Sequence, residues 1–118
     1  MRKTKTVKLS HPFEMFGKSV TEITVKEPTG GLYSQFGDPR IAVTNPSSGS
    51  IYFAEREDVI ATYLDQLIEH ETGGAPIVSQ LSLEDVITVK HAMLSFFHEA
   101  EAKAFKKLST LSFSASKS

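Results

Sequence analysis

The chain contains no cysteine and no long apolar run, and both absences narrow what it can be. Without cysteine it has no disulfide framework, no thiolate metal site and no cysteine nucleophile, which fits a reducing compartment. No apolar stretch approaches the roughly 18 residues of a membrane-spanning helix, and the polar N-terminus lacks the hydrophobic region of a signal peptide. We therefore expect a protein with no membrane partner that stays in the cytoplasm in which it is made.

The chain also lacks an excess of positive charge, since its formal net charge is -1. Nucleic-acid binders owe much of their affinity to clustered lysines and arginines that neutralise phosphates, so no nucleic-acid partner is expected. The only basic run is at the N-terminus and consists of Arg2, Lys3, Lys5 and Lys8. We interpret residues 1–5 as a flexible, solvated segment.

The histidines and serines lack the spacing of a catalytic or metal site. A zincin helix carries two histidines four residues apart around a glutamate. The pair that begins at His70 has Gly74 in the second position, and the pair that begins at His98 has Ala102. No serine stands in a Gly-x-Ser-x-Gly turn, and no lysine follows Gly30-Gly31 as in a phosphate-binding loop. We therefore predict no catalytic, cofactor-binding or metal-binding residue and no enzyme activity.

What is present is ordinary for one small globular domain. The 118 residues are 40% hydrophobic and 23% charged, which suits a single core. We place this domain over residues 6–108. The serine-rich end of the chain, residues 109–118, has only two large apolar side chains, so we predict a flexible tail there.

The first half of the chain carries the alternation typical of β-strands. Apolar residues alternate in Thr6–Phe13, β-branched residues are frequent in Ser19–Lys26, and a glycine turn separates the two, which predicts an N-terminal hairpin. Alternation resumes on both sides of a polar turn in Arg40–Phe53, and this favours a second hairpin over a loop. A short helix is expected over Leu32–Phe36.

Two amphipathic helices follow. Glu55–Thr72 has apolar residues at three- and four-residue spacings and is expected to end at Gly73-Gly74. Ser82–Leu108 opens with Ser82 as an N-cap and with acidic residues in its first turn. The short connector predicts that the helices pack as antiparallel neighbours. The fold class is therefore α+β, with an N-terminal β-hairpin, and a second one at 40–53 where it forms, packed on a C-terminal antiparallel helix pair.

The last helix has an unusually wide apolar face. At about 100° per residue, its apolar side chains span roughly 180° of the circumference, against the roughly 100° of a typical surface helix. Two interpretations stay open. Either the first hairpin and the first long helix cover the two flanks, or the flanks remain available to another chain as a helix-in-groove or oligomer contact. In the second case the partner-binding residues are Ile87, Leu94, Phe96 and Phe105.

The order of short motifs along the chain carries a family resemblance. Val7-Lys8-Leu9 is followed by Pro12, by Gly17 and by the strand sequence VTEITVKEPT at residues 20–29. This resembles the opening of the tail assembly chaperones of contractile-tailed, Mu-like bacteriophages, which has a short strand with a proline, a glycine turn and a strand of the type I-T-E-L-x-L-R-E-P. Lys26 stands where that family usually has arginine. The second half is similar in its helix, glycine break, Leu-Ser before an acidic helix start and paired phenylalanines, here Ile60 to Ile68, Gly73-Gly74, Leu81-Ser82 with Asp85, and Phe96-Phe97.

The resemblance implies a non-enzymatic helper of phage tail morphogenesis. Such proteins bind the long, helical, aggregation-prone tape measure protein and keep it soluble until tail tube subunits polymerise around it. They act in the cytoplasm of the bacterial host and are absent from the mature virion. The implied partner is therefore a tape measure protein, and a homo-oligomer stays open. The alternative is a small regulatory or antitoxin-like oligomer with no catalytic activity.

Overall fold

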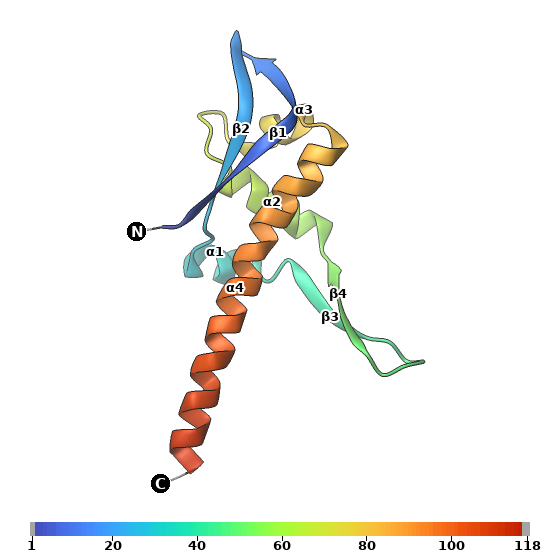
Figure 1. The fold of residues 1–118 in the computed structure, drawn as a ribbon, viewed down its shortest axis with the longest axis vertical. Coiled ribbons are helices and arrows are strands. Elements are labelled where there is room, and N and C mark those ends of the chain that lie inside the picture. The colour runs from blue at the N-terminus through green and yellow to red at the C-terminus, as the bar shows by residue number, and fades with distance from the viewer. Residues whose placement is uncertain (1, 117–118) are drawn as a thin grey trace.

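Within residues 2–116, which this computed structural model describes, two hairpins alternate with helices (Figure 1). Side chains are described for residues 2–108. The hairpins are antiparallel and form two separate sheets, β1–β2 and β3–β4, so the predicted α+β class is confirmed and the segment 40–53 is a hairpin. The elements in chain order are β1 (Thr4–Met15), β2 (Lys18–Lys26), α1 (Gly30–Phe36), β3 (Arg40–Thr44), β4 (Ile51–Glu55), α2 (Glu57–Leu67), α3 (Gly74–Gln80) and α4 (Leu83–Ser116).

The molecule is elongated. Its extents are 63 × 41 × 25 Å and its radius of gyration is 17.5 Å, whereas a compact domain of this length has a radius of gyration of about 13.5 Å. Two elements account for the difference, because the C-terminal part of α4 and the β3–β4 hairpin both extend away from the rest of the chain (Figure 1). The body consists of the β1–β2 hairpin, α1, α2, α3 and the first part of α4.

The β1–β2 hairpin forms one wall of this body. Its turn contains two residues with positive φ, Phe16 at 53° and Gly17 at 74°, a pair typical of a type I′ turn whose twist matches the strands. β1 begins at Thr4, which pairs with Lys26, and so starts inside the segment 1–5 that the sequence analysis interpreted as flexible. The inward-facing side chains of the hairpin are Val7, Leu9, Ile23 and Val25, all buried.

The buried carboxylate of Asp85, in the first turn of α4, fastens β1 to this helix. Its oxygens accept hydrogen bonds from the backbone N–H groups of Ser10 at 2.8 Å and His11 at 2.9 Å, within the bulge where the β1–β2 register shifts. Ser82 Oγ accepts from the backbone N–H of Asp85 at 3.2 Å, which confirms the predicted N-cap. Burial favours a raised pKa for Asp85, but the hydrogen bonds from Ser10 and His11 outweigh it and hold this pKa below its ordinary value.

The first long helix is shorter than predicted. We expected it over Glu55–Thr72, whereas α2 spans Glu57–Leu67. It ends early because the chain turns to extended backbone at Ile68, which forms an isolated antiparallel bridge with Val25 of β2, and the N–H of Glu69 donates to the carbonyl of Thr24 at 2.9 Å. Pairing with the first hairpin therefore replaces the last turns of the expected helix.

The connector between the two long helices contains a helix, α3, that the sequence analysis missed. Pro76 lies in the first turn of α3, where a missing N–H costs nothing, so this proline starts a new helix as well as ending the previous segment. Gly74 is needed at the start of α3, because a Cβ at this position would lie 2.1 Å from the carbonyl oxygen of Leu64. Ile77 is fully buried against the core. The two long helices are thus joined through a packed element.

The core lies where α2, α3 and α4 meet the inner face of the β1–β2 hairpin. Its largest fully buried side chains include Tyr63, whose hydroxyl donates to the carbonyl of Gly37 at 2.7 Å and whose ring meets that of Phe97 edge-to-face at 5.2 Å. The remaining buried apolar residues are Ile68, which follows α2, and, in the helices, Val59, Ile60, Leu64, Leu67, Ile77, Val89, Met93, Leu94, Phe96 and Phe97.

Helix α4 continues past Leu108, its predicted end, to Ser116. The side chains of residues 109–118 and the backbone of residues 117–118 lie outside the described residues, so the flexible tail stays a prediction. The lengthening still matters for the shape of the molecule, because it adds to the part of α4 that has left the body.

Candidate interaction site on helix α4

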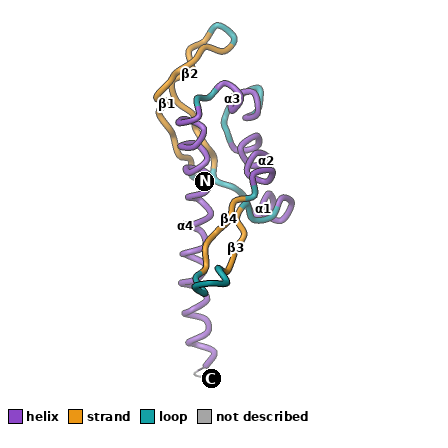
Figure 2. The backbone as a smooth tube through the Cα atoms, turned by 90° about the vertical axis from the view of Figure 1, so that its right-hand side faces the viewer, coloured by secondary structure: helices purple, strands orange, loops and turns teal. Residues whose placement is uncertain are grey.

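Helix α4 divides into a buried part and an exposed part. Up to Phe97 its apolar stripe packs against the body, whereas from Ala100 onward the apolar side chains of the same stripe are exposed. Figure 1 shows the C-terminal part of the helix extending alone beyond the body, and in Figure 2 its last turns extend past the β3–β4 hairpin. The stripe stays apolar on both sides of this boundary. The exposure changes because, within the described residues, no other element packs on the stripe beyond it. The exposed continuation, which we call the distal stripe, consists of Ala100, Ala104, Phe105 and Leu108.

The four residues predicted to bind a partner do not share one surface. Leu94 and Phe96 are part of the core, with Phe96 only 3% exposed, so the expectation that they remain available on the surface is wrong. Phe96 is covered by the β1–β2 hairpin, with Lys5 Nζ lying 4.5 Å from the centre of its ring. Leu94 lies two residues earlier, roughly 200° around the helix, so its burial comes from a different side of α4. The first of the two interpretations of the wide face, coverage by the fold, thus holds for this part of the helix.

The other two predicted residues are exposed but far apart. Phe105, 62% exposed, belongs to the distal stripe, and Ile87 lies near the start of α4. At 1.5 Å per helical residue they are about 27 Å apart along the axis. Ile87 borders a separate apolar groove of about 450 Å³ between α2, α3 and the first turns of α4. The structure therefore brings neither of them together with the other predicted residues.

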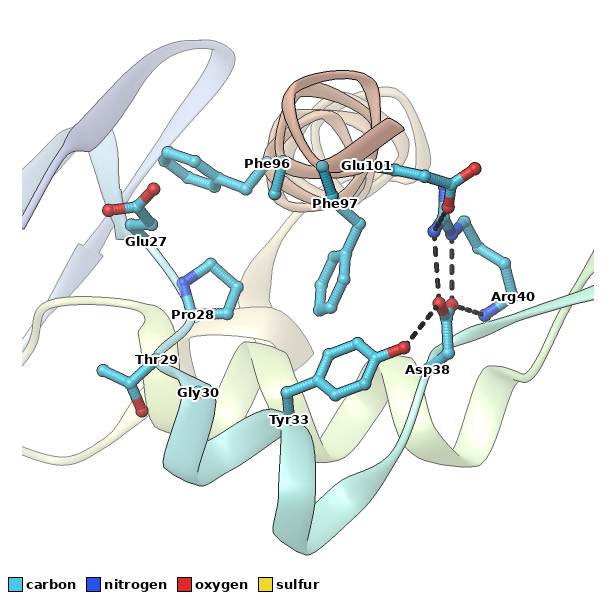
Figure 3. A pocket seen from close by; sticks show the side chains of 12 residues that line it. Glu27, Pro28, Thr29, Gly30, Tyr33, Asp38, Arg40, Phe96, Phe97 and Glu101 are labelled. Carbon is cyan, nitrogen blue, oxygen red and sulfur yellow. Dashed lines mark hydrogen bonds and ion pairs between the residues drawn. The ribbon is translucent and has the colours of Figure 1, made fainter. Parts of the chain in front are cut away.

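A hollow of about 390 Å³ lies at the root of the distal stripe, where α4 leaves the body (Figure 3). Phe96 and Phe97 line it from α4, and Tyr33 from α1 faces them across the opening. Its lining is mainly apolar, and the side of α4 that lines it leads directly into the distal stripe through Ala100 and Ala104. The other lining residues are Glu27, Pro28, Thr29, Gly30, Asp38, Arg40 and Glu101.

One end of the hollow is polar and is organised by the buried guanidinium of Arg40. This group donates to Asp38 Oδ1 and Oδ2, both at 3.1 Å, and to Glu101 Oε2 at 2.6 Å. It also donates through Nη1 to His98 Nδ1 at 2.9 Å. Because a guanidinium has no acceptor, Nδ1 of His98 must accept this bond. The network ties the base of β3 to the last packed turn of α4.

The ionisation of this cluster is set by its mutual contacts. Partial burial favours a raised pKa for Asp38, yet the hydrogen bonds and charge of Arg40 outweigh it and keep this pKa below its ordinary value. Hydrogen bonds to Asp38 raise the pKa of Arg40. Burial, followed by the charge of Asp38, raises the pKa of Tyr33, whose protonated hydroxyl donates to Asp38 Oδ2 at 3.3 Å. The carboxylates of Asp38 and Glu101 thus share the single cation of Arg40 at one end of a mainly apolar hollow.

Sequence analysis missed Arg40 as an organising residue. The residue pattern predicted only a short helix over Leu32–Phe36 and a hairpin from Arg40 onward, with no role for the Arg40 side chain. A usable signal was the spacing of Asp38 and Arg40, since an aspartate can accept from the backbone N–H two residues on, and here Asp38 Oδ1 accepts from the Arg40 N–H at 2.8 Å. The contact of Arg40 with Glu101 joins residues far apart in the chain and has no local signature.

The site presents mainly apolar surface. Among the described residues, no group of three or more histidines, cysteines and carboxylates is placed to hold a metal ion. In the same part of the chain, no helix combines the length and hydropathy needed to cross a membrane. What the site offers is a helix face and a hollow that are both mainly apolar, which suit an apolar side chain or helix face of another chain.

Comparison with known proteins found no match: no family model, no curated protein and no solved structure matches this chain. The features that indicate a function are therefore the geometry of α4 and the order of motifs in the sequence.

Proposed function

We propose that this protein is a non-catalytic tail assembly chaperone of a contractile-tailed bacteriophage, which binds an apolar helical segment of the tape measure protein and keeps it soluble while the tail tube assembles. It acts in the cytoplasm of the bacterial host and is not retained in the mature virion. The partner lies along the distal stripe of α4, with its largest side chain in the hollow at the root of the stripe.

The observation that carries this proposal is the continuity of the apolar stripe of α4 across the edge of the body. Phe97 is buried, and the residues one, two and three turns further on, Ala100, Ala104 and Leu108, follow it on the same side of the helix and are exposed. A helix that outruns its own core with an apolar face meets the requirement for helix-on-helix binding, in which a second amphipathic helix covers that face.

The small side chains in this stripe favour a close approach. Ala100 and Ala104 leave a shallow track between the larger Phe97 and Phe105, so a partner helix can lie near the α4 backbone. The carboxylates of Asp38 and Glu101 at the polar end of the hollow both accept hydrogen bonds from Arg40, so they are held at this end, away from the apolar lining. The order of motifs resembling the Mu-like tail chaperones supplies the identity of the partner, the tape measure protein.

The proposal is tested by coexpressing an affinity-tagged copy of this protein with the tape measure protein encoded in the same phage or prophage genome. The expected result is soluble tape measure protein that copurifies with the tagged chain. A tape measure protein that precipitates equally with and without the tagged chain contradicts the proposal.

Two alanines of α4 offer a matched test of the binding face. Ala104→Asp places a charge in the distal stripe, whereas Ala102→Asp places the same charge on another side of the same exposed helix. We expect Ala104→Asp to reduce copurification by about ten-fold or more, because an unpaired carboxylate would be buried in an apolar contact, and Ala102→Asp to leave it within about two-fold. Equal loss in both variants would show that the partner does not use this stripe.

A further inference from the structure

The β3–β4 hairpin is an arm with apolar side chains on both faces. Its tip extends away from the body (Figure 1), and its strands contact the body mainly at Arg40, Phe53 and Glu55 near their base. From the register of the pair, Phe53 and Ile51 lie on one face and Ile41 and Tyr52 on the other. All four are about half exposed or more, up to 70% at Ile51. No charged residue occurs between Arg40 and Glu55.

The edges of this arm carry none of the features that prevent strand pairing. Exposed sheet edges are usually protected by lysines, prolines or bulges. The β1–β2 hairpin has all three, with Lys5, Lys8 and Pro12 in β1 and a register shift before Phe13. Within β4, by contrast, the sequence from Ile51 to Ala54 is IYFA, in regular register with β3.

The hydrogen-bond pattern identifies which backbone groups of β4 are open. The N–H of Asn45 donates to the carbonyl of Ser50 at 2.7 Å, and the N–H of Arg56 donates to the carbonyl of Pro39 at 2.8 Å. Because hydrogen-bonded and non-hydrogen-bonded pairs alternate in an antiparallel ladder, these two bonds fix the pattern in between. It follows that Ile51, Phe53 and Glu55 turn their N–H and C=O groups outward. No backbone bond from these three residues to another element occurs within the described chain.

We propose that two copies of this chain associate through the open edges of β4, which pair antiparallel about a two-fold axis at Phe53 to form a four-stranded sheet. In this register Phe53 is opposite Phe53 of the second copy, and Ile51 is opposite Glu55 of the second copy. In this register the outward N–H and C=O groups of Ile51, Phe53 and Glu55 hydrogen-bond to the outward groups of Glu55, Phe53 and Ile51 of the second copy, respectively.

A second copy fits this edge better than an unrelated strand for two reasons. A two-fold axis through an antiparallel strand pair requires only that the edge be complementary to itself, which the spacing 51, 53 and 55 around residue 53 satisfies. The edge is also free of like charges at its centre, and the chain as a whole has a net charge of only -1, so little repulsion opposes two copies. This association does not depend on tape measure binding, which uses α4.

The first test uses a matched pair of prolines. Ile51 and Thr44 are directly opposite one another, and both turn their N–H groups outward, Ile51 on the edge of β4 and Thr44 on the edge of β3. Proline at either site leaves the bonds within the hairpin intact. In sedimentation velocity over a concentration series, wild type should show a reversible dimer. Ile51→Pro should raise the dissociation constant of this dimer by about ten-fold or more. Thr44→Pro should leave the constant nearly unchanged.

A wild-type chain that stays monomeric at all concentrations overturns the proposal, as does a larger effect of Thr44→Pro than of Ile51→Pro. Circular dichroism of both variants must match the wild type. If either variant is misfolded, the decision passes to a crosslinking experiment.

This second experiment uses the absence of native cysteine. In the proposed dimer the Cα atoms of the two Phe53 residues are about 5.5 Å apart, within the disulfide range of about 4.4–6.8 Å. Phe53→Cys should therefore form a covalent dimer under mild oxidation, whereas Ala42→Cys, directly opposite on β3, should not. Equal crosslinking of both variants, or crosslinking of Ala42→Cys alone, overturns the proposal.

Discussion

The two hairpins of this protein share a topology and differ in almost everything else. The β1–β2 hairpin buries one face against α4, and it has lysines, a proline and a bulge at its edges. The β3–β4 hairpin buries little, is apolar on both faces and has regular, unprotected edges. A two-stranded sheet is at best marginally stable alone in water. The first hairpin is stabilised by its own core, and the second is expected to be stabilised by its anchor at Arg40 and by another copy of the chain.

The largest difference between the hairpins should appear in the free energy of unfolding when one isoleucine in each hairpin is replaced by alanine. Ile23→Ala in β2 removes a side chain that is 3% exposed and should lower the free energy of unfolding by about 2–5 kcal/mol. Ile41→Ala in β3 removes one that is 49% exposed and should change it by less than about 0.5 kcal/mol. Urea unfolding followed by circular dichroism measures both. Comparable losses would mean that the second hairpin is also part of the core.

The cation that joins each hairpin to α4 provides the next comparison. Arg40→Met removes the partner of Asp38 and Glu101 and should cost about 1–3 kcal/mol, since it leaves half-buried carboxylates unpaired. Lys5→Met removes an ion pair with the more exposed Glu99 and should have a much smaller effect. Hydrogen exchange adds a local readout: in Arg40→Met the amides of Val43 and Tyr52 should exchange faster. Unchanged exchange there would show that Arg40 is not the anchor of the arm.

The attachment of the first hairpin through Asp85 should depend on pH. The pKa of Asp85 is lowered in the folded protein, so its contribution to stability is present above the unfolded-state pKa and is lost as the pH falls through the folded-state value. Asp85→Asn should therefore lower the melting temperature at neutral pH and flatten its dependence on pH in the acidic range. Parallel melting curves for both proteins from neutral to acidic pH would contradict this role.

The smallest effect on folding is expected when the second hairpin is given the edge chemistry of the first. Tyr52→Lys introduces a lysine into β4 at a side chain that is about half exposed. It should reduce self-association measured by light scattering at high protein concentration while changing the free energy of unfolding by less than about 0.5 kcal/mol. Undiminished self-association would show that the faces and edges of this arm are not what brings two copies together.

Much of the fold follows from local patterns in the sequence. Alternating apolar residues predicted both hairpins, and Ser82 with its acidic neighbours predicted the start of α4. The predicted end of α2 was wrong, because the helix is stopped by the pairing of Ile68 with Val25, and Val25 belongs to a strand that lies far away in sequence. Helix α3 was missed, since Pro76 was interpreted as the end of one helix when it also lies in the first turn of another.

The site was less predictable than the fold. Periodicity showed that the apolar face of α4 is wide, and this width is a property of the residues alone. Which part of the face is covered depends on where the other elements of the body lie, so Leu94 and Phe96 belong to the core and Phe105 to the surface. The sequence of a helix determines where its apolar stripe runs, but each part of the stripe is buried only where another element packs against it. Packing between distant segments therefore decided where α4 is free to meet another chain, because burial depends on neighbours in space.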